Sequence, residues 1–283
     1  MGGKGVKISG EHLRSIDDAL LYARSIVDMG GSFLVEEKLV GEEFSLMSFC
    51  DGTHCAHMPA IQDHKRAFEG DVGPNTGGMG TYSFENHSLP FLSEKNIIEA
   101  QKTNERVALE LKKQTGQNFR GVLYGGFMLT RSGVKVIEYN ARFGDPEAMN
   151  ALALLETDLI RVCQSIVSGS LADLNVSFSQ KATVCKYAVP VGYPDSPAKN
   201  FEIFCRPENQ NLYLAAVQEK DKKIIATGSR TAAFVGVGKN TVVAEGLAET
   251  GISEVRGNLF HRKDIGTSAL IGGRVNRMKE VLK

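Results

Sequence analysis

Two oxygen-bearing side chains, Glu138 and Asn140, lie two residues apart in a segment, residues 134–140, that has the composition of a β-strand. Side chains at this spacing point to the same face of a strand and lie about 7 Å apart. Carboxylate and amide oxygens suit a hard cation, and Mg²⁺ in ATP sites is held by one or two protein oxygens plus nucleotide phosphates. The pair is therefore a candidate metal site, with a solvated strand end as the alternative.

Two charged residues, Arg142 and Asp145, follow that strand directly. A guanidinium this close to a metal site is suited to neutralising a phosphoryl group during its transfer. Asp145 precedes Pro146, and Asp followed by Pro is also an ordinary helix start, with Asp as N-cap and Pro at the first helical position. We therefore expect a helix to begin here, and the cap is the favoured interpretation of Asp145 from the residues alone.

A glycine-rich loop opens the chain with Gly2, Gly3, Lys4 and Gly5. Backbone N–H groups of such a loop can surround a phosphate, with the lysine as a nearby positive charge. The loop is not a Walker A motif, because the chain lacks the required glycine and Ser/Thr spacing. It is a weak signal alone, and such loops usually follow a strand that holds them in place.

A second cluster joins residues 63–66 to the loop at residues 73–80. Lys65 and Arg66 bring two cations close to glycine backbone that can approach a ligand. His64 could titrate, but a single histidine is more often hydrogen-bonded scaffolding. The cluster as a whole is stronger support for a binding site than any one member.

The elements that position these residues follow from hydrophobic periodicity and turn signals. We expect helices at residues 12–29, 94–115 and 241–250, and a helix from about residue 145. We expect strands at 33–36, 43–49, 122–130, 134–140, 182–191, 212–218, 223–227 and 231–237. Residues 70–83 are predicted to be loop, and Gly272 and Gly273 to be turns. The pattern predicts an α+β fold with antiparallel sheets, and a domain boundary between residues 175 and 176, followed by a smaller β-rich domain.

The composition restricts the class of partner. The 283 residues are enough for about two domains, and 30 glycines without a Gly-X-Y period must serve turns or ligand sites. Lys plus Arg and Asp plus Glu both number 33, and there is no Trp, so we expect neither a nucleic acid nor a membrane partner. Five cysteines without a C-x-x-C pair, and no secretory signal, predict a cytoplasmic protein with reduced thiols.

Six motifs in order resemble the phosphoribosylamine–glycine ligases, a family of the ATP-grasp superfamily. They are Gly-Gly-Lys-Gly-Val at residues 2–6, Glu-Glu-Lys-Leu-Val-Gly-Glu-Glu-Phe-Ser at 36–45, Gln-Asp-His-Lys-Arg at 62–66, Gly-Pro-Asn-Thr-Gly-Gly-Met-Gly at 73–80, Ile-Glu-Tyr-Asn-Ala-Arg-Phe-Gly-Asp-Pro-Glu at 137–147 and Arg-Lys-Asp-Ile-Gly at 262–266. The resemblance runs from residue 2 to about residue 266. It implies a partial ATP-grasp domain over residues 1–175, shortened at its N-terminal side, and a β-rich domain over residues 176–283.

The resemblance also implies a role for each matching residue. ATP and Mg²⁺ or Mn²⁺ are the implied cofactors, with Glu138 and Asn140 holding the metal. The implied nucleotide-binding residues are Gly2, Gly3, Lys4, Gly5, Glu36, Glu37, Leu39 and Glu43. Arg142 and Lys65 are the implied catalytic residues. The implied substrate-binding residues are Asp63, His64, Arg66, Asn75, Thr76, Gly77, Gly78 and Asp145.

The implied reaction joins glycine to 5-phosphoribosylamine at the expense of ATP, through a glycyl phosphate, in purine synthesis. Strand 122–130 has no carboxylate, which separates the chain from carboxylase-type relatives. Family members have a further N-terminal part, so we expect a C-terminal part of the enzyme, with a separately encoded N-terminal half as one possible partner. A nucleotide-binding module without ligase activity, and a different ATP-grasp ligase, are the alternatives.

Overall fold

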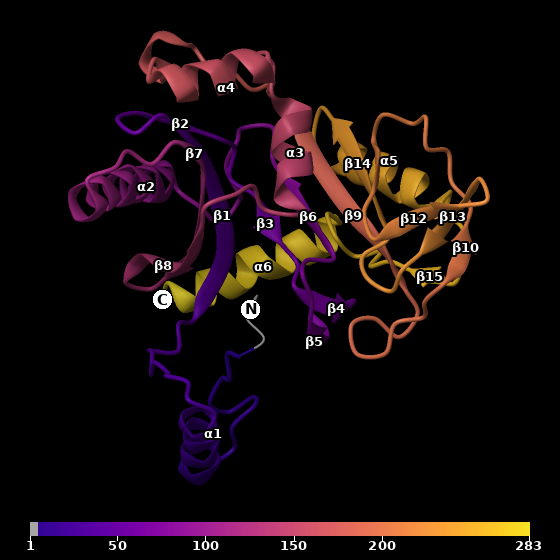
Figure 1. Ribbon diagram of the computed structural model, residues 1–283, viewed down its shortest axis with the longest axis horizontal. Helices are drawn as coiled ribbons and strands as arrows, with labels where there is room; N and C mark the ends of the chain where they lie inside the picture. Colours follow the sequence, from indigo (N-terminus) through magenta and orange to yellow (C-terminus); the bar gives the residue numbers. More distant parts are fainter. Residues whose placement is uncertain (1–4) are drawn as a thin grey trace. The chain divides into compact units, whose positions relative to one another are not determined.

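The structure is a computed structural model that describes residues 5–283 (Figure 1). The chain divides into two compact units, Met1–Val40 and Gly41–Lys283. The boundary of this division, between Val40 and Gly41, does not coincide with the predicted one at residue 175, which stays a prediction. Among the described residues, no helix is both long and apolar enough to cross a lipid bilayer.

Within residues 5–40, the described part of the first unit, there is one helix, α1 (Ile16–Asp28). It begins at a capping box, in which the Ser15 hydroxyl accepts from the Asp18 backbone N–H and the Asp18 carboxylate accepts from the Ser15 backbone N–H. This arrangement satisfies two N–H groups that a helix start would leave unpaired, and it confirms the predicted helix. The predicted strand at residues 33–36 is wrong, because no strand forms within residues 5–40, where Leu34 and Val35 are 86% and 89% exposed.

The first sheet of the second unit has the antiparallel order β2-β1-β7-β8. Its strands are β2 (Cys55–His57), β1 (Gly41–Cys50), β7 (Gly121–Thr130) and β8 (Gly133–Asn140). Helix α2 (Glu94–Thr115) covers one face of this sheet, and α4 (Leu159–Ser168) and the short 3₁₀ helix η1 (Leu171–Asp173) pack against β1 and β2 (Figure 1). The predicted strand at 43–49, the hairpin of β7 and β8 and helix α2 are confirmed.

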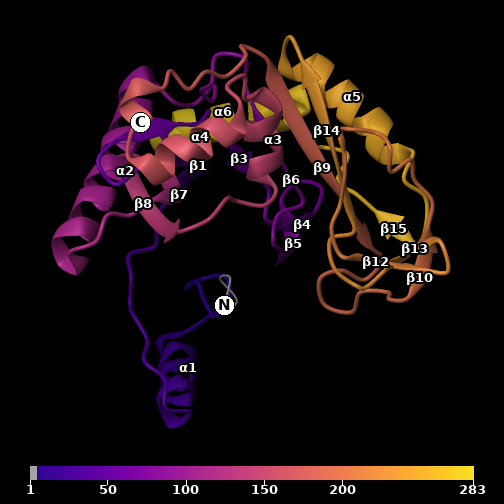
Figure 2. The same ribbon diagram turned by 45° about the horizontal axis from the view of Figure 1, so that its top comes forward.

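A larger second sheet has the order β11-β14-β9-β6-β3, with β15 pairing to β9. Its strands are β11 (Leu212–Leu214), β14 (Ala232–Gly238), β9 (Ala182–Pro190), β6 (Gly80–Ser83), β3 (Gln62–Asp63) and β15 (Leu259–Phe260). Every residue of β9 is buried, because α5 (Thr241–Ser253) and α3 (Glu147–Leu154) both pack against it (Figure 2). The predicted strands near 182–191 and 231–237, and the helices from about residues 145 and 241, are confirmed.

Residues 70–83 are only partly loop, so that prediction is wrong in part. Strand β5 (Val72–Asn75) pairs with β4 (Arg66–Phe68), and β6 lies inside the second sheet between β9 and β3. The segment from Gly80 to Ser83 is fully buried. Pairing with β9 and burial decide its conformation, and neither appears in the local glycine-rich composition.

The remaining elements complete the β-rich portion. Strands β10 (Phe201–Ile203), β13 (Lys223–Ala226) and β12 (Val217–Lys220) form a small antiparallel sheet. The predicted run at 212–218 is therefore split between β11 and β12. Helix α6 (Ser268–Val281) contains Gly272 and Gly273, so their prediction as turns is wrong. Nothing lies near the position of a Cβ on either glycine.

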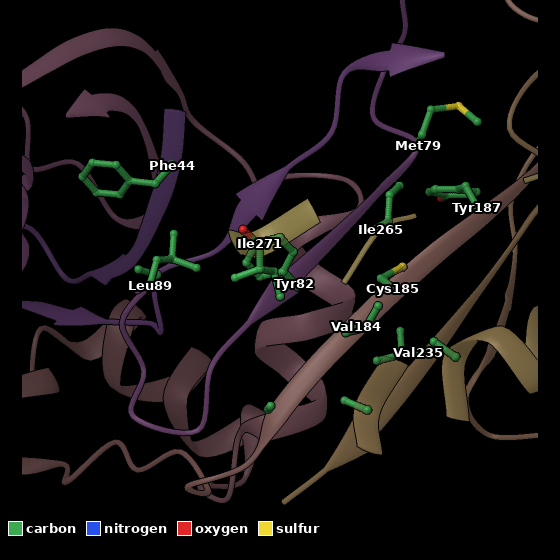
Figure 3. Packing of buried hydrophobic residues seen from close by; sticks show 14 of the residues in the cluster. Phe44, Met79, Tyr82, Leu89, Val184, Cys185, Tyr187, Val235, Ile265 and Ile271 are labelled. Atoms are coloured by element: carbon green, nitrogen blue, oxygen red, sulfur yellow. The ribbon is translucent and has the colours of Figure 1, made fainter. Parts of the chain in front are cut away.

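A shared core joins the sheets. Figure 3 shows Tyr82 of β6, Val184 and Cys185 of β9 and Val235 of β14 in one cluster of buried side chains with Ile271 of α6. The same core includes Phe44 of β1. The second sheet takes β3 and β6 from before residue 175 and β9, β11 and β14 from after it. Strand β3 packs against β1 of the first sheet.

Candidate functional site

The candidate site lies on the face of β1, β7 and β8 opposite to the α2 face. Glu43 of β1 and Gly126 of β7 share this face, because paired positions alternate along the register from Glu43↔Met128 to Ser45↔Gly126. Glu138 of β8 lies opposite Gly126. The register shifts between Gly126 and Phe127, so Ile137 is an extra residue, as in a β-bulge. Glycine at 126 leaves space for Glu138, since a Cβ there would lie 3.3 Å from the Glu138 Cγ.

Lys65 supplies the positive charge of this face. Its Nζ lies 3.3 Å from the Glu43 Oε2, and Lys65, Glu43, Asp63 and Glu138 line one small pocket. Burial lowers the pKa of Lys65, but the carboxylates of Glu43, Asp63 and Glu138 outweigh it, so its pKa lies above the ordinary value. Lys65 is therefore protonated, and it provides a cation among three acidic groups.

Asp63, which lines the pocket with Lys65, and Glu147 are two buried acids whose charges interact. Burial and the negative charge of Glu147 hold the pKa of Asp63 well above its ordinary value. Burial likewise raises the pKa of Glu147, which accepts a hydrogen bond of 2.9 Å from the Tyr124 hydroxyl. Two buried carboxyl groups in such proximity resist ionising together. Tyr124 and Glu147 were not among the residues predicted to act here.

The backbone of Gly78 packs closely against Asp63 and Pro146. It has φ of +117°, a conformation that residues with a Cβ rarely adopt. A Cβ at this position would lie 2.7 Å from the Pro146 Cδ and 2.8 Å from the Asp63 Oδ1. The close approach explains why a glycine is required where the loop at 73–80 meets the turn before α3.

Arg230, which precedes β14, binds both the loop at residues 73–80 and the turn before α3. Its guanidinium donates to the carbonyl oxygens of Gly77 at 2.9 Å and Asp145 at 2.9 Å, and pairs with the Asp145 carboxylate at 2.9 Å. It also stacks 4.7 Å from the Tyr187 ring centroid, and the Tyr187 hydroxyl donates to Asp145. Such a fork of donors fixes both loops in one geometry.

This geometry corrects the interpretation of Asp145 as an N-cap. Pro146 occupies the N-cap position of α3, and no side chain caps the helix. The Asp145 carboxylate is instead bound by Arg230 and Tyr187. Two partners far away in the sequence determine its role, and the local Asp-Pro signal cannot reveal them.

Family models match most of the chain. Residues 1–148 match the phosphoribosylglycinamide synthetase ATP-grasp (A) domain, and residues 183–268 match the C domain of the same synthetase. The chain belongs to the phosphoribosylglycinamide synthetase family. The ATP-grasp model alone covers more than half of the chain, and the two models flank the segment that contains the predicted boundary at residue 175.

Relatives of known name support the same family. The chain is 47% identical to a phosphoribosylamine–glycine ligase of Methanosarcina barkeri, over 99% of this chain and 65% of that protein. It is 48% identical to the corresponding ligase of Methanosarcina acetivorans, over 99% of this chain and 64% of that protein. The chain thus spans about 65% of the length of the relatives it matches.

Solved structures show the same fold. A phosphoribosylamine–glycine ligase of Thermotoga maritima superposes with a TM-score of 0.71 at 29% identity, covering 81% of this chain and 56% of that one. The biotin carboxylase domain of a Hydrogenobacter thermophilus 2-oxoglutarate carboxylase superposes with a TM-score of 0.61 at 13% identity, covering 99% and 58%. At that identity the second likeness concerns the fold alone.

Several synthetase-family residues predicted from the motifs meet at the site. Glu43, Asp63, Lys65 and Glu138 line the same pocket. Asn140 lies two residues after Glu138, opposite Tyr124. Among residues 5–283, no group of three or more His, Cys, Asp or Glu side chains is arranged to hold a metal ion. The described residues therefore offer no closed protein cage for a cation.

The hairpin of β4 and β5 organises the predicted substrate residues. Arg66 pairs in register with Asn75, and its guanidinium donates to the Gly73 carbonyl at 2.9 Å. The Thr76 hydroxyl donates to the Lys65 carbonyl at 2.8 Å and accepts from the Gly78 N–H at 3.1 Å. These contacts order the loop without using the Lys65 side chain.

His64 and Arg142 are not among the residues that line the pocket with Lys65. His64 is fully buried beside Tyr82, with Nδ1 3.2 Å from the Gly80 carbonyl oxygen. Burial, with the positive charges of Arg274 and Arg262, holds its pKa well below the ordinary value. This geometry favours the scaffold interpretation of His64. Arg142 is exposed and donates to the Phe143 carbonyl at 2.7 Å.

The predicted nucleotide residues are divided by the structure. Gly2, Gly3 and Lys4 lie outside the described residues. Gly5 is exposed, and its carbonyl accepts from the Tyr22 hydroxyl at 2.8 Å. Glu36, Glu37 and Leu39 belong to the first unit, in a segment without helix or strand. The assignment of these residues to the nucleotide therefore stays a prediction.

Proposed function

We propose that the chain forms part of an enzyme that joins glycine to 5-phosphoribosylamine and in the same reaction cleaves ATP to ADP and phosphate. The observation that carries this proposal is the open face on which Glu43, Asp63, Lys65 and Glu138 line one pocket, within a chain of the phosphoribosylglycinamide synthetase family. We infer the two substrates from the names of the relatives, which are phosphoribosylamine–glycine ligases. The product is glycinamide ribonucleotide.

The reaction needs two bond exchanges. A carboxylate oxygen of glycine attacks the γ-phosphorus of ATP, the bond to the β-phosphate oxygen breaks, and ADP leaves. The amine of 5-phosphoribosylamine then attacks the glycyl carbonyl carbon, phosphate leaves, and the amine loses a proton. Neither exchange requires a protein nucleophile, so the protein contributes position and charge.

Lys65 is the residue best placed to provide that charge. It is protonated and partly exposed, and it lies between Glu43, Asp63 and Glu138. A cation in a partly enclosed site stabilises the negative charge that develops on a transferring phosphoryl group. We assign Arg142, which is exposed at the end of β8, to the same region. Asp63, Arg66 and the backbone from Asn75 to Gly78 line the substrate side.

The donor set fits a cation shared with phosphates. Glu138 and Asn140 provide a carboxylate and an amide oxygen on one face of β8. Mg²⁺ or Mn²⁺ would be held there, with its other ligands from phosphate oxygens and water, as is usual in nucleotide sites. A bound cation would offset phosphate charge. The absence of a three-residue cage among the described residues agrees with this shared arrangement.

The adenine would be bound by Glu36 and by the backbone of Glu37 and Leu39, and the phosphates by Gly2, Gly3, Lys4 and Gly5. The relatives are longer than this chain. We propose that the complete enzyme also contains the portion that this chain does not match, on the same polypeptide or on a separate one. Free thiols at all five cysteines are compatible with a cytoplasmic enzyme.

The test combines this chain with the N-terminal portion of a relative and measures ADP release. We expect release that depends on both glycine and 5-phosphoribosylamine, and that Glu138→Gln reduces strongly. Glu105→Gln, a change of the same chemistry on α2, is the matched control and should leave turnover unchanged.

Three results would contradict the proposal. ADP release independent of glycine would refute it. Binding of Mg-ATP without turnover in any mixture would instead identify a nucleotide-binding module. Phosphate release with another carboxylate, but not with glycine, would identify a different ATP-grasp ligase.

A further inference from the structure

Cys50 and Cys55 face each other across the hairpin of β1 and β2. They are register partners, and the Asp51 N–H donates to the His54 carbonyl while the Met58 N–H donates to the Met47 carbonyl. These bonds mark the hydrogen-bonded positions as 51, 49 and 47 on β1, so Cys50 occupies a non-hydrogen-bonded position. Cα atoms of such a pair lie about 4.5 Å apart, within the range that a disulfide spans.

The two thiols are already close and differ in exposure. Their Sγ atoms are 3.0 Å apart. Cys50 is fully buried, whereas Cys55 is partly exposed. The hydrogen bond between the thiols lowers the pKa of Cys55 and, together with burial, raises the pKa of Cys50. Cys55 is therefore the thiol that ionises first and the one that a reagent can reach.

The turn that carries the pair is fixed on both sides. The Asp51 carboxylate accepts from the backbone N–H groups of His54 at 2.7 Å and Leu171 at 2.9 Å. The Arg120 guanidinium donates to the Asp51 carbonyl at 3.2 Å. The backbone therefore holds the two thiols in place, and bond formation requires only side-chain movement, from 3.0 Å to about 2.05 Å.

We propose that Cys50 and Cys55 form a modification site, a dithiol that small-molecule disulfides convert reversibly to an intramolecular disulfide. The Cys55 thiolate attacks one sulfur of the oxidant, and the first thiolate of the oxidant leaves. Cys50, losing its proton, then attacks the Cys55 sulfur, and the second thiolate leaves. Two protein thiols are oxidised and one disulfide is reduced to two thiols, with the two protons passing to the leaving thiolates or solvent.

The experiment treats the folded full chain with oxidised glutathione, removes the reagent, alkylates the remaining thiols and analyses peptides by mass spectrometry. We expect the peptide containing Cys50 and Cys55 to lack both alkyl groups and to be lighter by two hydrogens. Dithiothreitol should restore two alkylations. Cys50→Ser should trap glutathione on Cys55, because the second step is then lost.

Cys163→Ser is the matched control, because Cys163 is an exposed thiol outside the hairpin, and the paired peptide should be oxidised as before. The proposal is overturned if, in the unmutated chain, both hairpin cysteines are alkylated under conditions that add glutathione to Cys163. It is also overturned if Cys55 retains glutathione while Cys50 stays free. Both outcomes are read on the unmutated chain, so they hold even where Cys50→Ser does not fold.

Discussion

Two lysines surrounded by carboxylates occupy contrasting parts of the molecule. Lys186 of β9 is fully buried, and its Nζ donates to Glu245 at 2.6 Å, Glu249 at 2.7 Å and the Lys263 carbonyl at 2.8 Å. Lys65 is partly exposed, and within the described residues it donates one hydrogen bond, to Glu43 at 3.3 Å. An ammonium group has three donors, so Lys186 is saturated and Lys65 is not.

The difference distinguishes a structural charge from one available to a ligand. The Lys186 group also includes His261, whose Nε2 lies 3.0 Å from the Glu249 Oε1. Burial raises the pKa of Glu249, but its hydrogen bonds with Lys186 and His261 outweigh this, so the pKa is lowered. Among the described acids around Lys65, Glu43 accepts a hydrogen bond from Lys65 and Asp63 accepts one from the His64 N–H. Burial and the negative charge of Glu147 hold the pKa of Asp63 well above its ordinary value. We infer that phosphate oxygens would accept the remaining hydrogen bonds of Lys65, and that a metal ion would bind the carboxylate of Glu138.

The largest expected effect is on stability, from Lys186→Met. The substitution preserves side-chain volume but leaves Glu245 and Glu249 without their shared cation next to a buried strand. Removing one partner of a buried ion pair costs about 3–5 kcal/mol, and partial exposure of the two glutamates favours the lower end. Urea denaturation would measure this loss, and a loss below about 1 kcal/mol would show that solvent already satisfies the glutamates.

The complementary change, Lys65→Met, should act on turnover and leave the fold intact. Its ion pair with Glu43 is partly exposed, and such pairs contribute about 0–1 kcal/mol. Losing a charge that stabilises a transferring phosphoryl group reduces kcat by about 10²–10³-fold. Steady-state kinetics of the reconstituted enzyme and urea denaturation would be run together. If Lys65→Met and Lys186→Met lowered kcat equally and also lowered the free energy of unfolding equally, the proposed distinction between the two lysines would be wrong.

Arg230→Ala should produce an intermediate effect, because it frees two loops at once. Hydrogen bonds made by a charged group contribute about 1.5–3 kcal/mol, and here the guanidinium binds the carbonyls of Gly77 and Asp145 and the Asp145 carboxylate. We expect faster proteolytic cleavage near residues 73–80 and a rise in KM. Arg230→Lys keeps the charge but loses the fork, so rescue of both properties by lysine would contradict the positioning role.

Local sequence patterns predicted most of the longer helices and strands of the fold. Helix α2 has a strong start at Ser93 and a stop at Gly116 with φ of +72°, and its bounds were predicted correctly. Strand β6 and helix α6 were missed for one reason: glycines are typical of turns, but Gly80 pairs with β9, and Gly272 lies within a helix that packs against the core. Tertiary burial overrides local propensity at these positions.

Some of the residues that the motifs selected lie together in the structure. Glu43, Lys65 and Glu138 were selected from three separate motifs, and they line one pocket. Arg230 could not be found in this way, because Ser-Arg-Thr before a strand carries no chemical pattern of its own. Glu147 was included in a motif, but its pairing with Asp63 depends on the burial of both groups.

The smallest expected effect concerns the pH dependence of stability, and Asp63→Asn tests it. The pKa of Asp63 is raised well above 3.8 in the folded chain, so the folded state binds this proton more tightly than the unfolded state does. As pH rises through about 4, the unfolded chain ionises first, and the folded state loses stability until Asp63 ionises as well. Asparagine removes that loss, on the order of 1 kcal/mol per pKa unit, so urea denaturation from pH 4 upward should give a flatter profile.

Asp51→Asn is the control of opposite sign. Burial raises the pKa of Asp51, but its backbone hydrogen bonds outweigh burial and lower the pKa to about 2. The stability that Asp51 contributes is therefore present above pH 3.8 and is lost as pH falls towards 2. A profile for Asp63→Asn that stays as steep as that of the unmutated chain would mean that Asp63 is ionised in the folded state, and that Lys65 is already satisfied by it.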